Sequence, residues 1–201
     1  IAVVRATLEI SVVSIGWYLG GTVGIGTLLF AFGIGPCVAL GLYLVEKIFN
    51  DYNTNISPEN ILITPGGKPV IFISALIFGG EGKEIIYPNP GFPIYESVIN
   101  YSGAKPVPMK LDISNNFQIN LKNLEDSINK KTSLIIINFP SNPTGGIISK
   151  NDLDRLVLIL EKYPKIKILS DEIYSRIVYD RVNFISLLEY PEIRDRVIVL
   201  D

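Results

Sequence analysis

The feature that most constrains the fold is an alternation of strand-type and helix-type patterns along residues 60–200. Short apolar runs predict strands, and longer stretches with apolar residues at helical spacing predict helices. The predicted strands are 60–64, 84–87, 104–109, 134–138, 166–170 and 196–200, and the predicted helices are 67–78, 94–101, 121–129 and 149–161. The run at 134–138 is continuously apolar, as in a strand buried on both faces. This order predicts an α/β layered domain with a mainly parallel sheet.

Ligands bind in such sheets where strands end and loops begin, so the loops after the predicted strands are the candidate sites. In the first, Gly66 and Gly67 let the backbone approach a ligand closely, and Lys68 opens a helix. A helix N-terminus presents unpaired N–H groups and attracts anions. This loop predicts a phosphate site, with a plain glycine-rich connection as the alternative.

A second loop, at 87–92, ends in an aromatic ring. Phe92 could cover one face of a flat heteroaromatic ligand, because such rings stack on aromatic side chains. A core position is the more usual role of a lone phenylalanine, so this loop by itself favours the core role over ligand stacking.

Two further loops are more specific. The run Asn-Phe-Pro-Ser-Asn-Pro-Thr-Gly at 138–145 holds Asn142 in a rigid turn, where its amide can donate to a phenolate or carboxylate oxygen. The run Ser-Asp-Glu-Ile-Tyr at 170–174 places Asp171 at a strand end, where its carboxylate can pair with a protonated pyridine nitrogen. Tyr174 could reach an oxygen on the same ring. A proline-stiffened loop and surface carboxylates are the alternatives, and both are weaker when the two motifs occur together.

These motifs carry a resemblance to a known family. Asn-Pro-Thr-Gly at 142–145, the strand-end Asp171 with Tyr174, and Pro-Gly-Phe-Pro-Ile-Tyr at 90–95 resemble the class I/II aminotransferases, the aspartate aminotransferase superfamily. The likeness covers residues 50–201, with the motifs in family order. It implies the three-layer large domain of fold-type I enzymes and pyridoxal 5′-phosphate as the cofactor.

The resemblance implies cofactor contacts for seven residues: Gly66, Gly67, Lys68, Phe92, Asn142, Asp171 and Tyr174. By that resemblance the glycine turn and Lys68 contact the phosphate through their backbone. Phe92 stacks on the pyridine ring, Asn142 and Tyr174 bind the ring's 3-oxygen, and Asp171 holds the proton on the ring nitrogen.

The resemblance also implies an activity: transfer of an amino group between an amino acid and a 2-oxo acid, in a cytoplasmic homodimer. The family's Schiff-base lysine is expected in a Ser-x-Ser-Lys run after the strand at 196–200, and this sequence ends at Asp201. We therefore expect cofactor binding without catalysis by this chain alone, and an incomplete dimer surface. Related decarboxylases, lyases and synthases share these contacts, so the amino acid substrate stays open.

The front of the chain has a different character, because residues 10–45 contain no Asp, Glu, Lys or Arg. The apolar run at 26–45 has the length of a membrane-spanning helix, and residues 10–19 could end another span. The glycine pattern at 21–36 resembles small bacterial membrane proteins of the YczE type. We therefore expect a helical, membrane-associated segment at 1–49 and a partial aminotransferase domain at 50–201. A buried helix of a soluble protein is the alternative for 26–45.

A rival hypothesis places the function in residues 1–49, as a membrane protein fragment fused to an inert aminotransferase remnant. Composition excludes other classes. The net charge of −2 and the lack of a basic run argue against nucleic-acid binding. The single Cys37 argues against an internal disulfide and a cysteine-rich metal site, and the absence of histidine excludes histidine metal ligands and histidine-based catalysis.

Overall fold

The computed structural model describes residues 2–22, 24, 41, 43, 56–179 and 183–201. The chain divides into two units, Ile1–Ile61 and Leu62–Asp201, and each is described by itself. The first contains the helix α1 (Ala2–Tyr18) and the short 3-10 helix η1 (Pro58–Asn60). The second contains every residue of the predicted cofactor site.

The described residues give no support to the predicted membrane segment. None of their helices is both long and apolar enough to cross a bilayer. The helix α1 has 17 residues and ends at Tyr18, where a first span was expected to end at Leu19. The second predicted span, at 26–45, lies outside the described residues apart from Gly41 and Tyr43.

The second unit is built on a five-stranded sheet in the order β2-β1-β3-β4-β5, and every pair of neighbours is parallel. The strands are β1 (Glu84–Asn89), β2 (Lys105–Lys110), β3 (Thr132–Asn138), β4 (Lys167–Asp171) and β5 (Val197–Leu200). The helices are α3 (Lys68–Phe78), α4 (Ile94–Tyr101), α5 (Leu121–Ser127) and α6 (Lys150–Glu161). The short 3-10 helices are η2 (Ile113–Asn115), η3 (Leu187–Glu189) and η4 (Arg194–Arg196). The predicted α/β fold with a mainly parallel sheet is confirmed.

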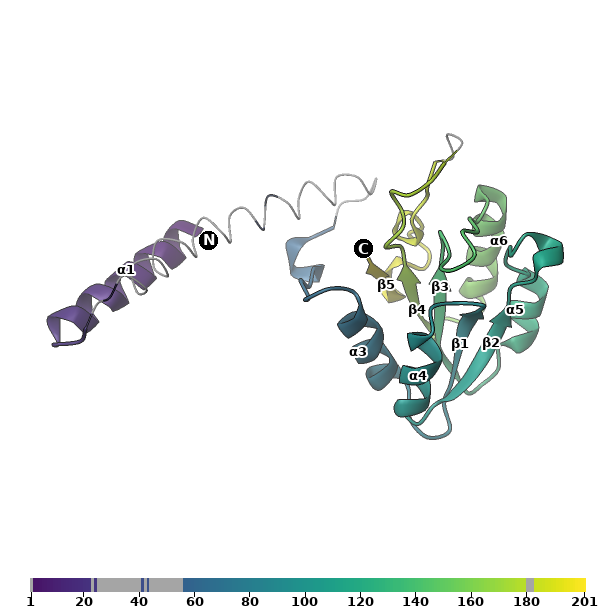
Figure 1. The fold of residues 1–201 in the computed structure, drawn as a ribbon, viewed down its shortest axis with the longest axis horizontal. Helices are drawn as coiled ribbons and strands as arrows, with labels where there is room; N and C mark the ends of the chain where they lie inside the picture. The colour runs from purple at the N-terminus through teal and green to yellow at the C-terminus, as the bar shows by residue number, and fades with distance from the viewer. Residues whose placement is uncertain (1, 23, 25–40, 42, 44–55, 180–182) are drawn as a thin grey trace. The chain divides into compact units, whose positions relative to one another are not determined.

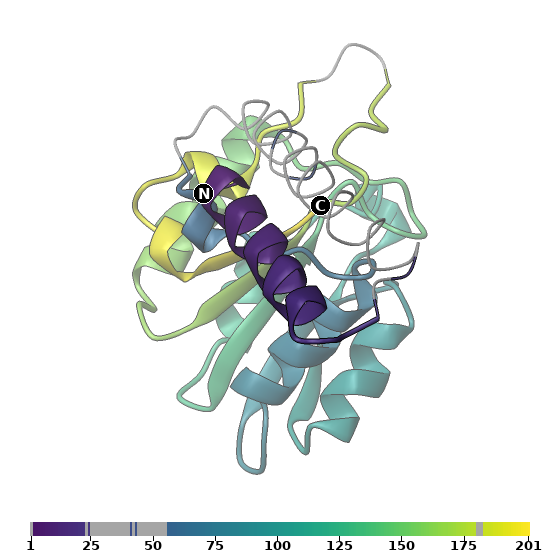
Figure 2. The same ribbon diagram turned by 90° about the vertical axis from the view of Figure 1, so that its left-hand side faces the viewer.

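Helices cover both faces of the sheet (Figure 1 and Figure 2). The side chains of β3 alternate between the two faces, as the pleat of a strand requires. Ile135 and Ile137 pack in one core with α5 and α6, whereas Leu134 and Ile136 pack in the other with α3 and α4. All four side chains are buried, which explains why the sequence shows a continuous apolar run here.

Local capping explains where α6 begins. Ser149 is its N-cap residue, and the Ser149 hydroxyl accepts a hydrogen bond of 3.1 Å from the backbone N–H of Asp152. The same hydroxyl donates to the Asp152 carboxylate at 2.8 Å. This confirms the predicted start of the helix, because a serine three residues before an acidic residue satisfies an otherwise unpaired N–H group.

One predicted strand is wrong. Residues 61–64 form no regular element, and the residues just before them form η1. Leu62 and Ile63 are largely exposed, and none of the described strands pairs with them. An apolar run becomes a strand only where a neighbouring strand accepts its backbone hydrogen bonds, and this run lacks one in the described part of the chain.

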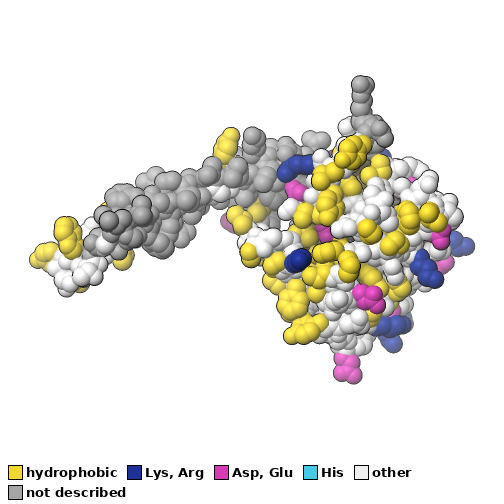
Figure 3. All heavy atoms as spheres, in the orientation of Figure 1, with side chains coloured by type: hydrophobic (Ala, Val, Ile, Leu, Met, Phe, Trp, Pro, Cys, Tyr) yellow, Lys and Arg dark blue, Asp and Glu magenta, His cyan; other side chains and the backbone are white. Residues whose placement is uncertain are grey.

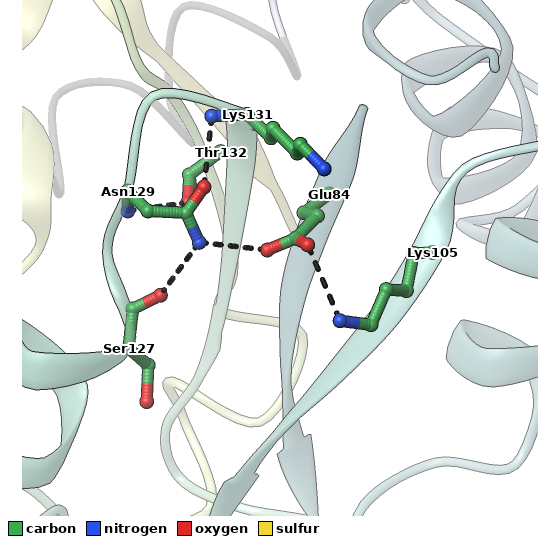
Figure 4. A network of polar contacts seen from close by, with 6 residues as sticks. All are labelled: Glu84, Lys105, Ser127, Asn129, Lys131 and Thr132. Carbon is green, nitrogen blue, oxygen red and sulfur yellow. Dashed lines mark hydrogen bonds and ion pairs between the residues drawn. The ribbon is translucent and has the colours of Figure 1, made fainter. Parts of the chain in front are cut away.

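A polar network closes the end of the sheet where the strands begin (Figure 4). The Glu84 carboxylate accepts from Asn129 at 2.8 Å and from Lys105 at 3.3 Å. The hydrogen bond from Asn129 is the main reason that the pKa of Glu84 lies below its ordinary value. The network ties β1, β2 and the turn before β3 together and leaves the opposite end of the sheet for the loops of the site.

Candidate functional site

A cavity of about 300 Å³ lies at the end of the sheet where the strands finish. Its lining includes all seven residues predicted from the sequence: Gly66, Gly67, Lys68, Phe92, Asn142, Asp171 and Tyr174. They come from four separate loops, which the parallel sheet gathers at one edge. The lining also includes Tyr95 and Asn138, which the prediction did not assign to the site.

The glycine turn adopts a conformation that glycine favours. Gly66 has φ of +88°, and the Thr64 hydroxyl donates to its carbonyl at 2.7 Å. Gly67 is the N-cap residue of α3, with no side-chain cap hydrogen bond. A Cβ on Gly67 would come within 2.9 Å of the Leu200 side chain on β5, so the turn packs closely against the last strand. Pro69 has no N–H, and the N–H groups of Val70 and Ile71 donate to the Gly67 carbonyl. An anion at the start of α3 could therefore bind the N–H groups of Gly67 and Lys68.

Phe92, in the loop after β1, and Tyr95, on α4, form an aromatic pair. Their ring centroids are 5.9 Å apart and the rings are nearly perpendicular, at 88°. Phe92 is half-buried and lines the cavity, whereas Tyr95 is fully buried. This edge-to-face contact is a favoured geometry and restrains the orientation of the Phe92 ring.

Among the described residues that line the cavity, only Asp171 is acidic. Its side chain is buried at the end of β4, and the Tyr95 hydroxyl donates to its Oδ2 at 2.5 Å. Burial raises the pKa of Asp171, while the hydrogen bonds from Tyr95 and from the N–H of Ile173 act in the opposite direction. A cation placed in the cavity would stabilise the charged form of this carboxylate.

Two asparagines join the loops after β3 and β4. Asn142 Nδ2 donates to the Tyr174 hydroxyl at 3.2 Å, so the two predicted partners of a ring oxygen do lie side by side. Asn138 Nδ2 donates to the Asp171 carbonyl at 3.0 Å, and Asn138 Oδ1 accepts from the Asn142 N–H at 3.0 Å. Asn138 thereby sets the position of both loops.

Sequence reasoning missed Tyr95 and Asn138 as site residues, although a signal existed for each. Tyr95 is the last residue of the Pro-Gly-Phe-Pro-Ile-Tyr run, on the first turn of α4. Asn138 is a polar residue at the end of an otherwise apolar strand. A buried polar side chain needs a partner, so an asparagine in that position predicts a hydrogen-bonding role.

Comparison with known proteins relates the chain to aminotransferases. The family model for aminotransferase class I and II matches residues 39–200, and thus includes the last residues of the segment 1–49. The probable aspartate aminotransferase of Methanocaldococcus jannaschii is 37% identical over 139 residues, which are 69% of this chain and 36% of that protein. The aspartate aminotransferase of Sulfolobus acidocaldarius is 38% identical over 151 residues, 74% of this chain and 37% of that protein.

Solved structures agree. The aspartate aminotransferase from Rhizobium meliloti superimposes with a TM-score of 0.72 at 28% identity, covering 76% of this chain and 38% of that one. An aromatic aminotransferase from Pyrococcus horikoshii also superimposes with a TM-score of 0.72, at 26% identity, covering 78% of this chain and 42% of that one. The expected likeness of residues 1–49 to YczE-type membrane proteins finds no support here. This chain spans less than two fifths of the length of the two curated relatives. It belongs to the class I and II aminotransferases, whose aspartate aminotransferase members depend on pyridoxal phosphate.

Proposed function

We propose that residues 62–201 form the cofactor-binding half of a pyridoxal-phosphate aminotransferase acting on an amino acid and a 2-oxo acid. The observation that carries the proposal is the convergence of seven residues, chosen from sequence, on one cavity beside a buried carboxylate. When bound, the cofactor supplies a pyridine ring that accepts electrons from the reacting carbon.

The chemistry of the cavity fits this group. Asp171 is a buried carboxylate that accepts hydrogen bonds from two neutral donors, the Tyr95 hydroxyl and the Ile173 N–H. A protonated ring nitrogen would supply the positive charge that neither donor carries. The start of α3 suits the phosphate, and the Asn142–Tyr174 pair suits a phenolate oxygen. Phe92 offers an aromatic surface to the ring. Lys68 belongs to the phosphate turn, and we assign it no catalytic role.

A direct test is titration of the full chain with pyridoxamine 5′-phosphate, followed by calorimetry. This form has the same phosphate, ring oxygen and ring nitrogen but no aldehyde that could react with lysine side chains. We expect one saturable site, and Asn142→Ala should weaken binding about tenfold, because a hydrogen bond to a charged oxygen is lost. Asn100→Ala, at an exposed position on α4, is the control. Lack of saturation, or equal affinities for the wild type and Asn142→Ala, would refute the proposal.

A second prediction concerns the pH dependence of binding. Tyr95→Phe removes the hydrogen bond that lowers the pKa of Asp171, so that pKa should rise further above its ordinary value. At a given acidic pH less of the carboxylate is charged, and the loss of affinity at low pH should begin at a higher pH than in the wild type. Affinity should also fall about tenfold at neutral pH. The pH profile of pyridoxamine phosphate binding checks this, with the exposed Tyr101→Phe as the control.

The surface of α3 supports a homodimer. Phe72, Ile73, Leu76 and Ile77 are exposed along this helix, where Figure 3 shows hydrophobic side chains gathered on the surface. Contiguous exposed apolar residues mark association surfaces. Because aminotransferase relatives are typically dimeric, we propose a second copy of the chain as the partner of this face.

A further inference from the structure

Glu172 follows Asp171 directly and points the other way. Successive side chains of a strand project to opposite faces, so Ser170 and Asp171 on β4 point in opposite directions. Glu172, just past the end of β4, binds the Ser170 hydroxyl and so lies on the side of the strand away from Asp171. Glu172 is 2% exposed and lies outside the cavity lining. A glutamate is rarely buried this fully unless other groups bind it, so its contacts reveal its role.

Glu172 connects four parts of the chain. Its Oε1 accepts from the Ser170 hydroxyl at 2.7 Å and from the backbone N–H of Leu187, at the start of η3, at 3.2 Å. Its own N–H donates to the Leu200 carbonyl on β5 at 2.8 Å. Its carbonyl accepts from the Ser175 N–H at 2.7 Å, which closes the turn that carries Tyr174.

The second carboxylate oxygen makes Glu172 unusual. Oε2 is buried with no hydrogen-bond partner among the described residues. Burial is the main cause that raises the pKa of Glu172 to about 7, and Asp201 raises it too, although the Ser170, Ser186 and Leu187 hydrogen bonds lower it. An orphaned buried carboxylate oxygen costs less free energy when it carries a proton.

The other charged groups near this junction are mostly acidic. Asp171, the last residue of β4, precedes Glu172. Glu189 lies on η3, where its carboxylate accepts from the N–H of Ser186, the N-cap residue. The Asp201 carboxylate is 3.5 Å from a guanidinium nitrogen of Arg176. Ionisation of Glu172 therefore adds a buried negative charge beside other carboxylates.

We propose that Glu172 is a positioning residue for the cofactor site. From outside the cavity it holds the end of β4 against β5 and η3. In this way it fixes the positions of Asp171 and Tyr174. This inference rests on the proposed function. The hydrogen bonds from Ser170, Ser186 and Leu187 favour the charged form of Glu172, but the cost of burying the charge outweighs them, so the folded junction is more stable when Glu172 is protonated. Cofactor affinity should therefore fall as Glu172 ionises.

The sign for stability follows from the same pKa. The folded-state value, about 7, lies above the ordinary value of 4.5. The stabilising contribution of protonated Glu172 is fully present below the ordinary pKa and is lost as pH rises through the folded-state pKa. Glu172→Gln keeps an acceptor oxygen and carries no charge, so this variant should lack that loss.

The test compares the full-length wild type with Glu172→Gln, Glu172→Ala and Glu189→Ala. Pyridoxamine phosphate affinity and the melting temperature of the unliganded chain are measured at about pH 6 and about pH 8. We expect Glu172→Ala to bind pyridoxamine phosphate about tenfold more weakly than the wild type at both pH values, because residues in contact commonly have coupling energies of this size. Glu172→Gln should match the wild type at the lower pH and, unlike the wild type, keep its affinity and melting temperature at the higher one. Glu189→Ala removes only the cap of η3, so it should lower the melting temperature and leave affinity within about twofold.

Three outcomes overturn the inference: wild-type affinity in Glu172→Ala, equal weakness of Glu172→Gln and Glu172→Ala, or a pH dependence that Glu172→Gln retains. If the wild type itself binds no pyridoxamine phosphate, the proposed function fails. The melting profiles then decide the junction separately. The junction is supported if the melting temperature of the wild type falls between about pH 6 and about pH 8 and that of Glu172→Gln does not. Parallel melting profiles of the two proteins refute it.

Discussion

Asp171→Ala is expected to weaken pyridoxamine phosphate binding about a hundredfold. Truncating one partner of a buried, hydrogen-bonded charge pair typically costs about 2–5 kcal/mol, and a hundredfold corresponds to about 2.7 kcal/mol. The Asp171 side chain is 4% exposed, so water cannot replace the lost carboxylate efficiently. Calorimetric titration of the full chain measures the effect.

The matched control for this prediction is Asp126→Ala, which removes an exposed carboxylate from α5, outside the cavity lining. Its affinity should equal that of the wild type. Asp171→Asn should fall between the two, because it keeps the shape of the side chain and loses the charge. If Asp171→Ala bound within about twofold of Asp126→Ala, the assignment of Asp171 to the ring nitrogen would be wrong.

Arg196→Ala is expected to lower the free energy of unfolding by about 3 kcal/mol or more. The buried guanidinium donates to the carbonyls of Leu160, Tyr163 and Ile166 at 2.7, 2.9 and 3.0 Å. These carbonyls lie at the end of α6 and in the turn leading to β4. Two of them also accept a backbone N–H, Leu160 from Tyr163 and Tyr163 from Ile166. The variant loses three hydrogen bonds from a charged donor, and each bond of this kind contributes about 1.5–3 kcal/mol.

Urea unfolding of the full chain measures this loss. Arg155→Ala provides the comparison, since it removes an exposed arginine of α6 whose ion pair with Asp152 spans 3.4 Å. An exposed pair of this kind contributes about 0–1 kcal/mol, so the difference between the two variants should be large. Arg196→Lys should lie between them, because one ammonium group cannot reach three separate carbonyls. Equal midpoints for Arg196→Ala and Arg155→Ala would contradict the assigned role.

The seven residues chosen from the sequence line one cavity, whereas one of the predicted strands is absent. Residues 60–64 have the composition of a strand but form none, because a strand also needs a neighbour. The start of α6 at Ser149 was predicted correctly, because capping depends on residues a few positions apart. Strand β3 was also predicted, since burial on both faces appears directly as an apolar run.

What the sequence determined by itself was the layered α/β fold and the set of loop residues around the cavity. Both follow from local order, because parallel strands bring their final residues to one edge of the sheet. Only the tertiary structure decided the side-chain partners: Tyr95 with Asp171, 76 positions apart, and Asn138 with Asp171, 33 apart. It alone also placed Glu172 against η3 and Arg196 against the end of α6. A buried polar group takes whichever partner the packed chain brings within about 3 Å, and no local pattern encodes that choice.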